Sequence, residues 1–221
     1  MSCVMVNITL VYFFFSKKFL CEKKARPPMY EFILYSRKGH TSSNFSTLSS
    51  AGRLDTVYQC ILTALFKSYG YRRDVIFHAI LEGPPNPPLH LQVDGRKLER
   101  TTVDEVTWTR VLNLVLKGQK YPGISIEKKS FEVLLKEKQQ ESIPIFVLHE
   151  KGKSIMEVEF GPDAVFVLGD NIGLPKQKEK FALRFGEKIS LGKQSYLALS
   201  CIDIINFLLD NYARTHFGVS R

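Results

Sequence analysis

The chain has 221 residues, enough for one domain with a sizeable hydrophobic core. Its hydrophobic content of 44% and charged content of 24% are those of a globular protein and argue against an intrinsically disordered chain. The formal net charge of +9 favours a polyanionic partner such as nucleic acid. Four cysteines without C-x-x-C spacing indicate no metal site and no disulfide framework, and they suit a reducing compartment.

The first 28 residues differ from the rest of the chain. The run "VMVNITLVYFFF" (4–15) is apolar but too short to span a bilayer. Its positive charges follow the apolar run, which is the reverse of a secretory signal. We interpret residues 1–28 as an extension or disordered tail ahead of one domain at 29–221, with a membrane-touching anchor as the alternative.

The domain opens with an alternating strand at 30–36, followed by a polar loop and an amphipathic helix. Gly70 stands where a left-handed cap would end that helix. A short apolar strand follows "YRRD" (71–74), and the strand–helix–strand order predicts parallel pairing. The apolar face of the helix is expected to consist of Leu54, Val57, Tyr58, Ile61, Leu62 and Leu65.

The middle of the chain contains weaker signals. Residues 89–99 predict a small hairpin that turns at Asp94–Gly95. Thr102 and Glu105 have the spacing of a capping box, which predicts the start of a helix at Thr102. A short strand is expected within 123–129, and a further helix from Ser130.

The last eighty residues are the most regular. Hydrophobic strands are predicted at 143–148, at 164–169 and at 187–192, with a short helix at 175–186 between the last two. The chain then enters a long helix, whose apolar side is expected to carry Leu197, Cys201, Ile204, Ile205, Leu208 and Tyr212. The whole pattern indicates one α/β domain with a mostly parallel sheet.

Three loops leave the carboxyl ends of predicted strands, after Leu148, after Leu168 and after Leu191. Ligands of open α/β sheets bind at that edge. Glycines such as Gly169 and Gly173 let backbone groups approach a ligand, although they are equally common as plain turn formers. There is no Walker A sequence, so a neutral or zwitterionic nucleotide-like cofactor is favoured over a triphosphate.

Two pairs of charged residues admit a structural or a functional interpretation. Arg53 and Asp55 in "GRLD" stand at the mouth of the first helix, where an acid simply favours the helix dipole. Alternatively the arginine binds a phosphate or a base edge beside a carboxylate that takes a proton. Arg72 and Arg73 are either a solvated strand edge or a phosphate clamp.

Four segments together carry a resemblance. "GRLD", "RRDV" followed by "PNPP", "FVLGDNIG", and "ISL" ahead of "YLALSCI" occur in this order. In these motifs the chain resembles the archaeal tRNA pseudouridine N1-methyltransferases of the SPOUT superfamily, the knotted methyltransferases. The resemblance extends from Met29 to the C-terminus.

The resemblance implies a parallel-sheet α/β fold with helices on both faces and a deep C-terminal trefoil knot, at about 143–215. It also implies a homodimer that binds S-adenosylmethionine in the knot. By position, the cofactor contacts would be Leu148, Gly169, Ser190, Leu191, Gly192, Lys193, Gln194, Ser195 and Cys201. No stable membrane association is expected, and the location would be cytoplasmic.

The implied substrate is a T-loop pseudouridine of tRNA (position 54), methylated at N1. That nitrogen must lose a proton, so we expect Asp55 to accept it or to orient the base, with Arg53 beside it. Arg72 and Arg73 would hold the RNA backbone. Ser200 stands where the family pattern has histidine, which makes the modified position less certain. The alternatives are a knotted methyltransferase acting on ribosomal RNA and a non-catalytic RNA-binding homologue.

Overall fold

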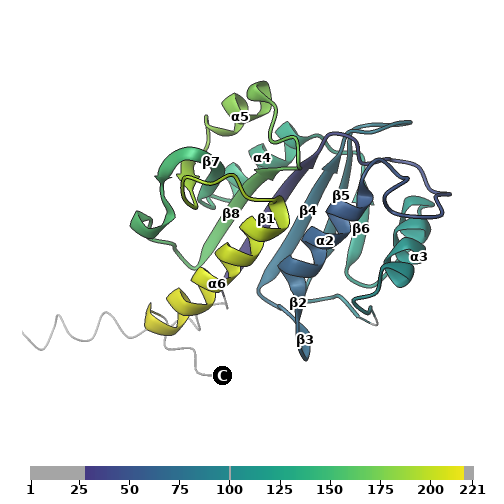
Figure 1. Cartoon of the computed structure of the whole chain (residues 1–221), viewed down its shortest axis with the longest axis horizontal. Coiled ribbons are helices and arrows are strands. Elements are labelled where there is room, and N and C mark those ends of the chain that lie inside the picture. Colours follow the sequence, from purple (N-terminus) through teal and green to yellow (C-terminus); the bar gives the residue numbers. More distant parts are fainter. Residues whose placement is uncertain (1–27, 100, 217–221) are drawn as a thin grey trace, which may run out of the picture.

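The computed structural model of the chain describes residues 28–99 and 101–216, with side chains as far as residue 211 (Figure 1). The interpretation of the N-terminal segment as a tail therefore concerns residues that, apart from residue 28, lie outside the described part. No helix within the described ranges combines the length and the apolar character needed to cross a membrane.

The described residues form a seven-stranded sheet in the order β6-β5-β4-β1-β8-β7-β9. The five strands from β4 to β9 in this order are parallel, and β5 runs antiparallel to its neighbours β4 and β6. The predicted mostly parallel α/β sheet is thus confirmed. The strands are β1 (Met29–Ser36), β4 (Val75–Leu81), β5 (Leu89–Asp94), β6 (Ile124–Glu127), β7 (Ile145–Ser154), β8 (Asp163–Gly169) and β9 (Glu187–Ser190).

Helices cover both faces of the sheet, as expected from the alternation of apolar residues in β1. Phe32 and Leu34 face one core and Ile33 and Tyr35 face the other. The first core is covered by α2 (Leu54–Leu65), α3 (Glu105–Leu116) and α6 (Ala198–His216), and Figure 1 shows α2 and α6 on the same side of the sheet. The second is covered by α4 (Phe131–Gln140) and α5 (Lys176–Ala182), while a short 3₁₀ turn, η1 (Ile155–Glu157), joins β7 to β8.

Two turn predictions were wrong. Helix α2 ends at Leu65, and the chain enters a two-stranded hairpin of β2 (Phe66–Lys67) and β3 (Gly70–Tyr71) instead of reaching a cap at Gly70. The hairpin is favoured because the Phe66 ring packs edge-on against Tyr71 and against Trp108. Asp94–Gly95 does form a turn, but β5 pairs with β4 and β6 and not with the residues that follow the turn.

Two helix predictions also need correction. The N-cap of α3 is Asp104 and not Thr102, because the Asp104 carboxylate accepts the Thr107 N–H at 2.7 Å. In α6 the most deeply buried apolar residues are offset by about one position from the predicted set, and Leu197 is 59% exposed. The residues that pack inward are Ala198, Ile202, Ile205 and Leu209. The Tyr212 side chain lies outside the described part.

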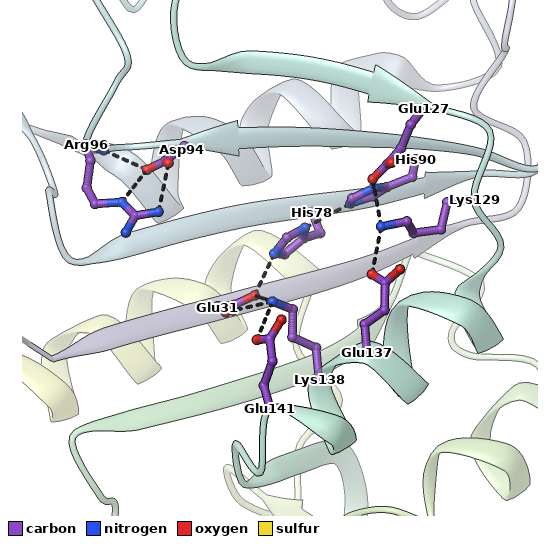
Figure 2. A network of polar contacts seen from close by, with 10 residues as sticks. All are labelled: Glu31, His78, His90, Asp94, Arg96, Glu127, Lys129, Glu137, Lys138 and Glu141. Atoms are coloured by element: carbon purple, nitrogen blue, oxygen red, sulfur yellow. Dashed lines mark hydrogen bonds and ion pairs between the residues drawn. The ribbon is translucent and has the colours of Figure 1, made fainter.

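A buried polar network crosses the sheet on the face that α4 partly covers (Figure 2). His78 Nε2 lies 2.7 Å from Glu31 Oε2, and His78 Nδ1 lies 2.9 Å from His90 Nε2. His90 Nδ1 in turn lies 2.9 Å from Glu127 Oε1. Two lysines bind the carboxylates at the two ends of this series of side chains. Lys138 contacts Glu31, and Lys129 bridges Glu127 and Glu137.

The network fixes the protons on its two imidazoles. Burial lowers the pKa of His90 from its ordinary 6.5 to about 4, so this ring is neutral at pH 7. A neutral His90 that donates Nδ1–H to Glu127 must accept at Nε2, and the proton of that bond comes from His78 Nδ1. The other ring nitrogen of His78, Nε2, lies 2.7 Å from Glu31 Oε2.

We predict that acid destabilises the fold through His90. Its folded-state pKa of about 4 lies below the unfolded value of 6.5, so the unfolded chain binds more protons as the pH falls through this window. The free energy of unfolding should fall from about pH 6.5 to about pH 4, by up to about 1.4 kcal/mol per pH unit from this group. Urea denaturation across this range measures it.

The matched variants are His90→Gln, which cannot titrate, and His40→Gln at a half-exposed position outside the network. The pH dependence should be shallower for the first and unchanged for the second. Equal slopes for wild type and His90→Gln would contradict the assignment.

Candidate functional site

A cavity of about 600 Å³ lies beside the middle of β7 and at the carboxyl ends of β8 and β9. Its size falls within the range of about 300–1,000 Å³ typical of small-molecule sites. The loops predicted after Leu168 and after Leu191 contribute to its wall, together with the start of α6. The prediction of a loop after Leu148 was wrong, because β7 continues to Ser154 through a shift in its register against β9, and Leu148, His149 and Glu150 line the cavity from within this strand. The wall residues from β7 to α5 are Leu148, His149, Glu150, Leu168, Gly169, Asp170, Asn171, Ile172, Gly173, Leu174, Lys176 and Glu179. Those that follow β9 are Leu191, Gly192, Gln194, Ser195, Tyr196, Leu197, Ala198 and Cys201.

The loop after β8 folds tightly over the end of its strand. A Cβ on Gly169 would lie 2.2 Å from the Leu174 nitrogen, so only glycine permits this approach. The Asp170 carboxylate accepts the Ile172 N–H at 2.9 Å and the Arg37 N–H at 2.8 Å. Asp170 therefore stabilises this wall of the cavity and ties it to the residue after β1.

The loop after β9 is shaped by a buried hydroxyl. The Ser190 Oγ accepts the Gly192 N–H at 3.1 Å and shares its own proton between the carbonyls of Glu150 and Gly192. Gly192 has a φ of 141°, and a Cβ there would meet nothing within 4 Å. The backbone at Gly192 thus borders open space in the cavity wall, where a side chain would occupy room otherwise available to a ligand.

The structure brings together seven of the nine residues expected to contact the cofactor. Ser190 is buried beneath the loop and Lys193 does not line the cavity. Burial raises the pKa of the Cys201 thiol to about 11, so this wall residue is not a nucleophile at neutral pH. The seven expected cofactor contacts that line the cavity are Leu148, Gly169, Leu191, Gly192, Gln194, Ser195 and Cys201.

Charged residues in the cavity wall escaped the sequence interpretation. Glu150, Asp170 and Glu179 line it, against the single cation Lys176. Glu179 is held by Lys188 of β9, whose Nζ lies 2.6 Å from its Oε1. No pattern in the sequence signals that Glu179 of α5 pairs with Lys188 of β9. With Glu179 paired to Lys188, the acids left in the wall to favour a positively charged ligand are Glu150 and Asp170.

Arg53 and Asp55 lie at the start of α2, outside the set of residues that line the cavity. Arg53 is the N-cap residue, with a left-handed φ of 70°, and its Nε donates to the two Asp55 oxygens at 3.0 and 3.2 Å. The charge of Asp170 also acts on Arg53 and helps to raise its pKa, after the larger effect of Asp55. Because Asp170 lines the cavity, the Arg53–Asp55 pair belongs to its surroundings.

Arg72 and Arg73 lie apart from the cavity. The Arg72 guanidinium makes a two-point contact with Asp210 of α6, both N–O distances being 2.7 Å. Arg73 Nη1 donates to the carbonyls of Gly95 and Arg96, and its guanidinium lies over the Tyr71 ring. Arg73 is exposed, whereas the Arg72 side chain is only 12% exposed.

Known proteins share both the sequence and the fold. The family model described as "Putative SAM-dependent RNA methyltransferase" matches residues 29–213. A tRNA (pseudouridine(54)-N(1))-methyltransferase of Methanococcus maripaludis is 36% identical over 195 residues, covering 82% of this chain and 98% of the relative. The enzyme of the same name from Methanocaldococcus jannaschii is 34% identical over 199 residues, covering 82% and 97%.

A solved structure agrees with the fold. The crystal structure of Archaeoglobus fulgidus Nep1 bound to S-adenosylhomocysteine has a TM-score of 0.60, at 15% identity, and the likeness covers 85% of this chain and 98% of Nep1. The family match and the identities to the archaeal relatives confirm the resemblance first seen in the sequence motifs. The chain belongs to the SAM-dependent RNA methyltransferase family of the archaeal tRNA pseudouridine-54 N1-methyltransferases.

Proposed function

We propose that this protein transfers the methyl group of S-adenosylmethionine to N1 of pseudouridine 54 in the T loop of tRNA. The observation that carries the proposal is the cavity beside the middle of β7 and at the ends of β8 and β9, found in a chain that belongs to this family. Its walls include the loops after Leu168 and Leu191 that were predicted from the sequence, together with Leu148, His149 and Glu150 of β7. The net charge of +9 suits a tRNA substrate.

The residues of the cavity fit the cofactor. S-adenosylmethionine carries a sulfonium and an ammonium cation, and three carboxylates stand in the wall against one lysine. Leu148, Leu168 and Leu191 provide apolar surface for an adenine ring. The open space beside Gly173 and Gly192 leaves backbone groups accessible to a ligand. When bound, the cofactor supplies an electrophilic methyl group.

The chain must remove the N1 proton of the base. We assign this role to Asp55, whose side chain is 21% exposed at the positive end of α2. Arg53 holds that carboxylate in place through its Nε and leaves the rest of its 52% exposed side chain for the substrate. A base at this position also needs alignment with the methyl donor, which the cavity walls provide.

Arg72 and Arg73 are proposed to act on the RNA backbone in different ways. Arg73 is exposed and presents its guanidinium beside Tyr71, an arrangement suited to a phosphate. Arg72 is tied to Asp210, so its contribution to RNA binding includes fixing α6 against the start of β4. Removing Arg72 is therefore expected to affect stability as well as tRNA affinity.

Membership of the family supports three further proposals. The segment 143–215 is proposed to form a trefoil knot, consistent with the insertion of β8 between β1 and β7 in the sheet. The active form is proposed to be a homodimer, in which exposed apolar side chains such as Tyr196 and Leu197 beside the cavity become covered. Light scattering would then give twice the chain mass of 25.3 kDa. The location is proposed to be cytoplasmic, with the tRNA.

The function is tested with labelled S-adenosylmethionine and two forms of one tRNA, carrying pseudouridine or uridine at position 54. Only the first has a nitrogen at N1 free for methylation, because N1 of uridine bonds to the ribose. We expect label in the pseudouridine form and background in the uridine form. Equal labelling of both would reject pseudouridine N1 as the target.

The role of Asp55 is tested by Asp55→Ala. We expect kcat to fall by a factor of about 10²–10⁴, the usual contribution of a general base, with the affinity for S-adenosylmethionine unchanged. The matched control is Glu105→Gln, which removes an acid from the first turn of α3, away from the cavity. Asp55→Ala with wild-type turnover would remove Asp55 from the mechanism.

The tight turn after β8 is tested by Gly169→Ala. The added Cβ would collide with the backbone of Gly173 and Leu174, so the loop must shift and lose its shape against the cofactor. We expect S-adenosylmethionine affinity measured by calorimetry to fall at least about tenfold, equivalent to about 1.4 kcal/mol. Gly161→Ala is the control, because its Cβ would meet only Asp163 O at 3.8 Å. Undiminished affinity in Gly169→Ala would show that the loop adapts.

A further inference from the structure

A second cavity of about 560 Å³ lies at the other end of the sheet, between the end of α3, strand β6 and the proline-rich loop before β5. None of its wall residues has a part in the site described above. The wall consists of Thr41, Asn86, Leu89, Val115, Leu116, Gly118, Gln119, Lys120, Tyr121, Ile124, Ser125, Ile126 and Lys128.

Both cavities have wall residues at the same edge of the sheet. Strand pairing places Gly169, Tyr35, Ile80, His90 and Glu127 in one row across β8, β1, β4, β5 and β6. The first cavity begins at one end of this row and the second at the other, where Lys128 follows β6. Four strand spacings of about 4.8 Å separate the ends by roughly 19 Å.

That separation suits a single nucleic acid lying across the edge. Successive nucleotides of one nucleic-acid strand are about 3.4 Å apart along a duplex axis, so roughly six nucleotide steps cover 19 Å. The loop after β1 connects the two sites directly. The Arg37 N–H bonds to Asp170 in the wall of the first cavity, and Thr41, four residues later, lines the second.

The two cavities have opposite charge. The first has three carboxylates in its wall, whereas no Asp or Glu lines the second within the described part of the chain. Lys120 and Lys128 supply the charge of the second cavity, and both are exposed. Lys128 Nζ donates to the carbonyls of Asn86 and Pro87, each at 2.8 Å, which positions the ammonium and leaves its third proton for an anion.

The remaining wall suits a base. Leu116 and Ile126 offer an apolar surface, and the half-buried Tyr121 adds an aromatic ring. Bases stack on such surfaces irrespective of their identity. Gln119 and Ser125 add side chains that can donate to or accept from a base edge. A nucleotide requires cations for its phosphate, an apolar surface for its base and polar side chains for the edge of that base. The second cavity combines these three features.

We propose that this second cavity is a nucleotide subsite for the substrate RNA, which takes a nucleotide other than the one that is methylated. Lys120 and Lys128 bind its phosphate, and its base enters the cavity between the end of α3 and β6. The identification of the RNA as tRNA rests on the proposed function. The existence of the subsite rests on the position, charge and lining of the cavity.

The test uses Lys120→Glu, Lys128→Gln and the double variant in the full chain, with tRNA affinity measured at several salt concentrations. Each single change should weaken tRNA binding at least about fivefold, and each should lower the slope of log Kd against log salt by about 1. The affinity for S-adenosylmethionine should stay at the wild-type value, because neither lysine lines the first cavity. Lys120 is exposed on a turn, so its replacement does not disturb the core.

The matched control is Lys136→Glu on α4, an exposed lysine that lines neither cavity. Cavity variants that bind tRNA as tightly as this control would overturn the subsite. If the wild type binds tRNA through these lysines but does not methylate it, the subsite stands and the proposed function fails. If methylation proceeds and the lysine variants bind normally, only the subsite fails.

Discussion

Strand β1 is the constraint on which the rest of the structure depends. It pairs in parallel with β4 on one side and with β8 on the other, so it joins the first half of the chain to the last eighty residues. All its residues are buried, and its alternating side chains supply both cores. The same pairing sets Tyr35 level with Gly169 and with Ile80, and thereby brings the loops after β1, β4 and β8 to one edge.

The shared edge carries two environments of opposite charge. Beside β7 and β9, carboxylates and leucines surround a cavity suited to a cationic cofactor. Beside β6, two lysines and an apolar surface form a cavity suited to a nucleotide. The Arg53–Asp55 pair at the start of α2 belongs to the same edge, because α2 begins after the loop that follows β1. The proposed function places the methyl donor in the first cavity and the proton acceptor at Asp55, both at this edge.

Periodicity succeeded where burial on one face decides the local structure. The stripe on α2 reflects contact with one core, and the strand predicted at β1 supplies alternate side chains to both cores; both elements were confirmed by the structure. The errors occur where a distant partner outweighs a local signal. Gly70 has the chemistry of a cap, but the packing of Phe66 against Tyr71 and Trp108 ends α2 earlier. Strand β5 has its own turn at Asp94–Gly95, yet its hydrogen bonds go to β4 and β6.

The sequence by itself determined the α/β class, because hydrophobic spacing is a local property of the chain, and its motifs carried the resemblance to the family. It also located two loops that line the first cavity, after Leu168 and after Leu191. The tertiary structure decided which charges meet. Glu179 reaches the cavity only because α5 packs beside β9, and Arg72 meets Asp210 only because α6 crosses near the start of β4. It also decided that His78 and His90 contact each other between Glu31 and Glu127. Such pairings join residues far apart in the chain, and no local pattern encodes them.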